Sequence, residues 1–188
     1  MRLLLLFFAF TLSALGTPPA EFVGAARAQV GVTLQYDPGY TELGYPGGDV
    51  PIERGVCTDV VVRAMRKVGL DLQKAVHEDM KRSFSAYPKI WGLKVADRNI
   101  DHRRVLNLAR YFERQRKEVP VTSNAGDYQP GDIVTCIVPP HLPHIMIVSD
   151  RFSPEDPGRP LIIHNIGQGA REEDRLFEFE LTGHYRWW

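Results

Sequence analysis

Apolar residues recur at helical spacing through the first part of the chain. In residues 58–68, Val61, Ala64, Met65 and Val68 fall at positions i, i+3, i+4 and i+7, and Gly69 follows. This spacing predicts a buried amphipathic helix that ends at the glycine. Weaker versions of the same pattern predict three more helices, over residues 19–29, 72–84 and 101–116.

After Pro120 the pattern changes to short runs rich in β-branched residues, separated by Pro, Gly and Asp clusters. These runs predict strands over residues 133–138, 145–149, 161–164 and 176–180. Helices first and strands second indicate an α+β domain in which a helical layer packs on a small antiparallel sheet. Residues 36–55, in contrast, are dense in turn formers, and long loops of this kind are often functional.

The chain starts with a short positive segment followed by an apolar one. Met1 and Arg2 precede residues 3–15, which are apolar apart from Thr11 and Ser13, and this is typical of a secretory signal peptide. The alternative is an uncleaved anchor, although the run is shorter than the roughly 20 residues that cross a membrane. We therefore expect a signal peptide over residues 1–16, a single domain over residues 17–188, a periplasmic or secreted protein, and no stable membrane span after cleavage.

The charge balance narrows the class of partner. The 188 residues include 23 Lys plus Arg and 23 Asp plus Glu, and 44% are hydrophobic, which is ordinary for a soluble globular domain. A neutral balance gives no indication of a nucleic-acid groove. We expect no nucleic-acid partner.

The two cysteines allow two interpretations. In an oxidising compartment Cys57 and Cys136 are candidates for a disulfide. Cys57 also directly precedes the strongest predicted helix, where the helix dipole and unpaired N–H groups favour a thiolate and can stabilise an oxyanion. At this point Cys57 is either half of a disulfide, a buried small residue, or a nucleophile.

A nucleophilic thiol needs a base, and the six histidines differ in their surroundings. His144 opens one predicted strand and His164 ends the next, so pairing of the two strands places these imidazoles side by side, with His164 orienting His144. Asn165 is the other candidate for the third position, but successive strand residues face opposite sides, which favours His164. We expect His77 and His102 on exposed helix surfaces.

Two other polar motifs carry weaker indications. The segment HLPH at residues 141–144 resembles metal-ligand spacing, but Pro143 excludes a helix and no established zinc signature accompanies it. We expect no metal. The segment DHRR at residues 101–104 either binds a substrate carboxylate through its arginines or forms a solvated helix start.

Several strings taken together resemble the bacterial family called domain of unknown function 1287. They are YPGGDVP at 45–51, RGVCTDV at 54–60, NIDHRR at 99–104, GDIV at 131–134, HIMIVSD at 144–150, IHNIG at 163–167 and GHYR at 183–186. The match covers nearly all of residues 17–188, and the combination is specific where any one string would be weak.

The resemblance implies a papain-like fold of the NlpC/p60 superfamily, whose better-known enzymes cut amide bonds in peptidoglycan stem peptides. It implies Cys57 as nucleophile, His144 as base and His164 as the polar third residue, with Tyr45 positioning substrate. Met146 departs from the small residue usual two places after the histidine. Cys136 replaces an expected aromatic residue and is read as core packing rather than as a partner of Cys57.

The sequence therefore predicts a cysteine hydrolase, an amidase or endopeptidase, acting on peptidoglycan peptides or another amide or acyl substrate without a cofactor. Two alternatives stay open. One is a non-catalytic cell-envelope binding module on the same fold, and the other is a thiol acyltransferase or thioesterase, because thiol acyl-enzymes serve several reactions.

Overall fold

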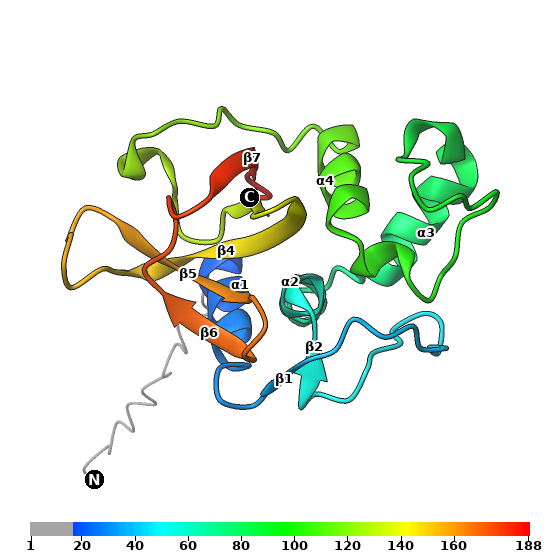
Figure 1. Cartoon of the computed structure of the whole chain (residues 1–188), viewed down its shortest axis with the longest axis horizontal. Helices are drawn as coiled ribbons and strands as arrows, with labels where there is room; N and C mark the ends of the chain where they lie inside the picture. Colours follow the sequence, from blue (N-terminus) through cyan, green and yellow to red (C-terminus); the bar gives the residue numbers. More distant parts are fainter. Residues whose placement is uncertain (1–16) are drawn as a thin grey trace, which may run out of the picture.

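The computed structural model describes residues 17–188, so the expected signal peptide over residues 1–16 lies outside the described residues (Figure 1). The helices are α1 (Pro18–Arg27), α2 (Cys57–Lys67), α3 (Leu72–Ser83) and α4 (Val105–Arg114), with short 3-10 helices η1 (Phe84–Ala86), η2 (Asp101–Arg103) and η3 (Ala125–Asp127). The strands are β1 (Gln35–Tyr36), β2 (Arg54–Gly55), β3 (Ile133–Val138), β4 (Leu142–Phe152), β5 (Pro160–Asn165), β6 (Ala170–Glu173) and β7 (Glu180–Tyr185). Within residues 17–188, no helix has both the length and the apolar character needed to cross a membrane.

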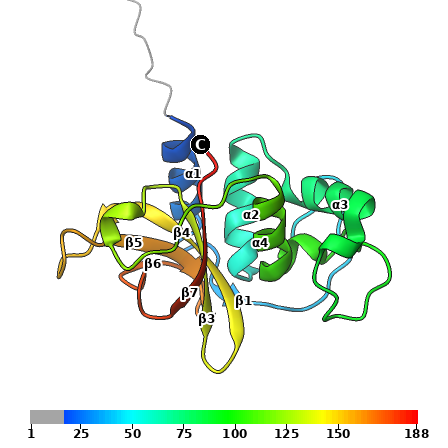
Figure 2. The ribbon, with the colours of Figure 1, turned by 90° about the horizontal axis from the view of Figure 1, so that it is seen from above.

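The sheet has five antiparallel strands in the order β6-β5-β4-β3-β7. Helix α2 packs against β4 and β5, α4 packs against β4 and β7, and α3 lies behind them against α2 and α4. Figure 2 shows these three helices together on one side of the sheet. The two layers confirm the predicted α+β class.

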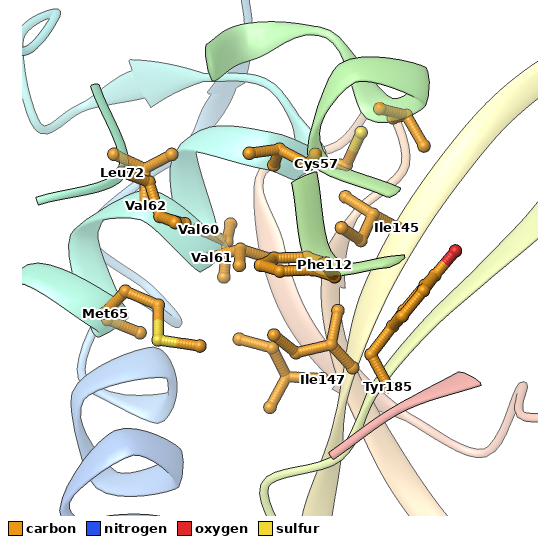
Figure 3. Packing of buried hydrophobic residues seen from close by; sticks show 14 of the residues in the cluster. Cys57, Val60, Val61, Val62, Met65, Leu72, Phe112, Ile145, Ile147 and Tyr185 are labelled. Atoms are coloured by element: carbon orange, nitrogen blue, oxygen red, sulfur yellow. The ribbon is translucent and has the colours of Figure 1, made fainter. Parts of the chain in front are cut away.

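Alternation along β4 divides the interior into two clusters of buried side chains. Ile145 and Ile147 face the helices and pack with α2 and α4, as Figure 3 shows. Met146 and Val148 face the other way and pack under the loops that carry Tyr128 and Leu176. Both faces of the sheet are therefore covered, one by helices and the other by loops.

Most predicted elements are confirmed within a few residues, and two are wrong. Residues 176–180 are not a strand; the last two strands are instead β6 and β7, on either side of that segment. The helix expected from residue 101 is interrupted: η2 ends at Arg103 and α4 begins only at Val105. Arg104 between them has extended backbone angles, which turn its side chain out of the helical path.

Candidate functional site

The first residue of α2 is Cys57, and a buried ion pair fixes this end of the helix. The Asp59 carboxylate accepts a hydrogen bond from the backbone N–H of Val56 at 2.7 Å. Arg103 donates to both oxygens of the same carboxylate at 2.9 Å, and the two side chains are only 2% and 3% exposed. The start of α2 is thus held to η2, which places Cys57 at a defined position.

The Cys57 sulfur lies among backbone N–H groups. Those of Ile145, Thr58 and Cys57 itself are within hydrogen-bonding reach and favour the thiolate. Burial outweighs them, helped by the Asp59 carboxylate, and raises the pKa of the thiol to about 12. The thiol is therefore protonated at neutral pH, in a setting that would stabilise negative charge on an atom bound beside it.

A cleft of about 240 Å³ opens over Cys57. Tyr36 from β1, Trp91 from the loop after α3, and Pro143 from β4 line it, together with Arg104. Its walls are mostly apolar and aromatic, with a few polar groups, which is the usual make-up of a small-ligand site.

Arg104 is the cationic group at the wall of this cleft. Its guanidinium carbon lies 4.2 Å from the centre of the Trp91 ring, and its Nη1 donates to Asp101 at 3.2 Å. The side chain is 17% exposed, and burial lowers the pKa of the guanidinium. Of the two sequence interpretations of residues 101–104, the solvated helix start does not describe Arg104, because its side chain is largely shielded from water.

The predicted pairing of His144 and His164 is confirmed. Nε2 of His144 lies 2.8 Å from Nδ1 of His164, and Nε2 of His164 lies 3.1 Å from a carboxylate oxygen of Glu173. Both imidazoles are buried. Burial, then the neighbouring His164 and Arg175, lower the pKa of His144 to about 3, so its ring is neutral across the physiological range.

The structure does not join this pair to Cys57. His144 has the strand parity of Met146 and Val148, which belong to the outer cluster, whereas Cys57 packs with Ile145 and Ile147 on the helical side. The Cys57 sulfur is nevertheless within hydrogen-bonding reach of the backbone N–H of Ile145, the residue that follows His144, so it lies beside the β4 backbone. Within residues 17–188, no hydrogen bond joins the Cys57 sulfur to either imidazole, and the expected contact between Cys57 and His144 stays a prediction.

The remaining candidates also separate by face. Cys136 is the cross-strand partner of His144 on the outer face, and both cysteines are free. Asn165 faces the helical side, where its Nδ2 donates to the carbonyl oxygen of Gly55 at 3.0 Å. It therefore ties β5 to the segment before α2, and His164 rather than Asn165 meets His144, as the alternation predicts.

Tyr45 does not line the cleft. Its ring packs edge-on against His77 at 5.3 Å between centroids, and Tyr36 lies beside Cys57 instead. His102, which we expected on an exposed surface, is 2% exposed, because η2 packs against α3, α4 and α2. Among residues 17–188, no group of three or more His, Cys, Asp or Glu side chains is placed to hold a metal ion.

Two residues of the site were not singled out from the sequence. Trp91 lies in an irregular loop where no periodicity indicates its direction, and Glu173 lies in a charged run that resembles a solvated turn. A signal for Glu173 was present, because residues 170–173 directly follow the turn-forming segment NIGQG at 165–169.

Comparison with known proteins identifies relatives. A family model described as "Domain of unknown function (DUF1287)" matches residues 23–187. The chain is similar to "Uncharacterized protein YijF" of Escherichia coli (strain K12), with 57% identity over 162 residues, which cover 86% of this chain and 78% of that protein. No solved structure matches.

Proposed function

The chain belongs to the family described as domain of unknown function (DUF1287), and from this premise we propose that it binds an acidic peptide in the cleft over Cys57. The ligand class that we propose is the stem peptide of peptidoglycan, which carries free carboxylates. This ligand class is consistent with the signal peptide that we propose for residues 1–16, because a signal peptide would deliver the protein to the periplasm or the exterior, where peptidoglycan lies. The observation that carries the proposal is the guanidinium of Arg104 stacked on Trp91.

The chemistry of Arg104 supports a carboxylate ligand. Only Nη1 is engaged by Asp101, and among the described residues its Nε and Nη2 groups have no hydrogen-bond partner. A guanidinium offers parallel donors that match the two oxygens of a carboxylate. Stacking on Trp91 fixes the plane of the Arg104 guanidinium, which lowers the conformational entropy lost when a ligand binds.

Calorimetric titration with a synthetic stem peptide tests the proposal. Arg104→Met keeps much of the apolar stem and removes the donors, so we expect binding to weaken about tenfold. Arg82→Met, which removes an exposed arginine of α3, is the control and should bind like the wild type. Equal affinity for Arg104→Met, or for a peptide with amidated carboxyl groups, would contradict the proposal.

A second candidate function is hydrolysis of the bound peptide by Cys57. It is supported by the backbone N–H groups of Ile145, Thr58 and Cys57 around the sulfur, which suit a tetrahedral oxyanion. The thiolate would attack an amide carbonyl, the amine would leave with a proton, and water would release the acyl group. This candidate also needs a proton acceptor for the thiol, and within residues 17–188 neither imidazole of the His144–His164 pair is hydrogen-bonded to the sulfur.

Mass spectrometry of digested peptidoglycan separates the two candidates. If the protein only binds, neither the wild type nor Cys57→Ala releases fragments, and both bind the stem peptide with the same affinity. If Cys57 is a nucleophile, the wild type releases fragments and Cys57→Ala does not. Release of a transferred rather than hydrolysed acyl group would identify an acyltransferase.

A further inference from the structure

A second cavity lies between α3 and the loop that precedes η2, away from the cleft over Cys57. Its volume is about 550 Å³, larger than the 240 Å³ of the cleft. The two cavities share no lining residue. Nothing in the proposed function therefore depends on this second cavity, and it requires its own explanation.

The body of this cavity is apolar. Met80 of α3 and Phe84 of η1 lie on one side, and Val95 and Ala96 of the loop lie on the other. Val95 is 73% exposed, which is unusual for a branched apolar side chain at the edge of a pocket. An apolar ligand chain would cover these carbons and remove them from water.

The polar groups that line the cavity are basic. They are Lys81, Lys94 and His77, and no acidic residue lines it. Among residues 17–188, neither lysine makes an ion pair, in contrast to most arginines of the chain, which are paired with carboxylates.

The nearest acidic side chains are already engaged. Glu78 pairs with Lys74 at 2.9 Å, and Asp97 accepts hydrogen bonds from the backbone N–H of Asn99 and from the hydroxyl of Tyr40. Asp97 keeps its charge, but within residues 17–188 no carboxylate forms an ion pair with either lysine at the rim of the cavity. A bound anion would supply the missing charge.

His77 adds an unsatisfied polar atom at the same place. Its Nδ1 is buried and has no hydrogen-bond partner, although buried polar atoms in native proteins are nearly always bonded. The edge of the Tyr45 ring holds the imidazole in position. Because this atom is closed to solvent, a ligand oxygen would bond to it only if the imidazole turned toward the cavity.

We propose that this cavity binds an amphipathic anion, an apolar chain that ends in a carboxylate. The chain lies against Met80, Phe84 and Val95, and the carboxylate lies between Lys81 and Lys94, beside the His77 ring. The apolar contacts supply most of the free energy, and the two lysines select the sign of the charge.

Titration with decanoate at pH 7, followed by NMR shift changes of backbone amides, tests this proposal. We expect saturable binding with changes centred on α3 and on residues 94–96. Decyltrimethylammonium, which has the same chain and the opposite charge, should bind at least about tenfold more weakly, because it faces two unpaired lysines. Acetate, which lacks the chain, should not bind.

Two variants and a control complete the test. Lys81→Glu/Lys94→Glu should weaken decanoate binding by about tenfold or more. The difference in affinity between decanoate and decyltrimethylammonium should become smaller in this variant. Lys67→Glu is the control, because Lys67 is an exposed lysine at the end of α2 and shares with Lys81 a position in the last turn of a helix. Val95→Glu, on an exposed side chain that the fold does not need, should also abolish binding.

Equal affinity for decanoate and decyltrimethylammonium would overturn the proposal in favour of nonspecific apolar association. Unchanged affinity of Lys81→Glu/Lys94→Glu for decanoate would do the same. Binding of decanoate only as part of anionic vesicles, with none to the free acid, would also overturn it, because that result indicates a membrane surface. Since the cavity and the cleft share no lining residue, failure here leaves the test with the stem peptide unaffected.

Discussion

The Nε2 atom of His144 lies 2.8 Å from Nδ1 of His164, and this contact fixes the protonation of both rings. Glu173 can only accept, so His164 donates from its own Nε2 to that carboxylate. Nδ1 of His164 is then an acceptor, and His144 donates to it from Nε2. The proton acceptor left over is Nδ1 of His144, on the outer face of the sheet.

We predict that both histidines are Nε2–H tautomers, which the ¹⁵N chemical shifts of the ring nitrogens report directly. Glu173→Leu removes the acceptor that orients the chain of hydrogen bonds, so the preference of His164 for the Nε2–H form should fall. Glu113→Leu is the control, since Glu113 pairs with Arg110 on α4 and is not bonded to either histidine or to Glu173. A proton on Nδ1 of His144 in the wild type would contradict the assignment.

The buried histidines predict a stability that falls in acid. Burial is the largest cause that lowers the pKa of His144 to about 3 and of His102 to about 4, from about 6.5 in the unfolded chain. Below pH 6.5 the unfolded chain therefore binds protons that the folded chain does not, and stability is lost as the pH falls. Burial also lowers the pKa of His164 and of His77. Burial of Asp101 raises its pKa to about 6, which opposes this trend with one carboxyl against four histidines.

Urea unfolding at pH 7.5, 6 and 5 measures the effect. Each histidine lowers the free energy of unfolding by up to about 1.4 kcal/mol per pH unit between its unfolded and folded pKa values. His102→Gln removes one of these titrations and should flatten the dependence. A urea midpoint that is constant between pH 7.5 and 5 would disagree with the buried neutral rings.

The helices were predictable because their apolar residues lie on one side. Val61, Ala64 and Met65 give α2 a single buried stripe, and Gly69 marks its end, so the helix expected over 58–68 is found at Cys57–Lys67. The same logic placed Cys57 at a helix start. The neighbourhood of His144 and His164 was also predictable, since residues of equal parity on paired strands share a face.

The relation of Cys57 to His144 was not predictable from the pattern. Residues 145–148 are apolar on both faces of β4, because helices cover one face and loops cover the other, so alternation does not indicate which face meets α2. Strand β6 was missed for a different reason. Glu172 and Glu173 are polar on both faces because one pairs with Arg27 and the other with His164, and a charged run of this kind has no apolar period.

The Asp59–Arg103 pair should contribute strongly to stability when one partner is removed. Asp59→Leu leaves a guanidinium that is 2% exposed without its counter-charge and removes the acceptor for the Val56 N–H. We expect the free energy of unfolding to fall by about 3–5 kcal/mol. Asp59→Leu/Arg103→Met should be less destabilised than the sum of the single variants, because no charge is left buried.

Glu113→Leu is the matched control for this prediction. It breaks the Arg110–Glu113 pair, whose side chains are 41% and 31% exposed. It should lower the free energy of unfolding by less than about 1 kcal/mol. Urea unfolding of the four variants provides the comparison. A loss below 1 kcal/mol for Asp59→Leu would show that the pair does not fix the start of α2.

The reactivity of Cys57 decides between a binding cleft and a nucleophile. Burial raises the pKa of its thiol to about 12, so in Cys136→Ala the rate of alkylation by iodoacetamide should rise about tenfold per pH unit up to pH 10 without a plateau, because only the thiolate reacts. The same chain unfolded in urea should react faster and level off above about pH 9. Cys57→Ala/Cys136→Ala, which has no thiol, supplies the background rate. A fast reaction that levels off near pH 7 would instead reveal a thiolate stabilised by the N–H groups of Ile145 and Thr58, and would favour hydrolysis over binding alone.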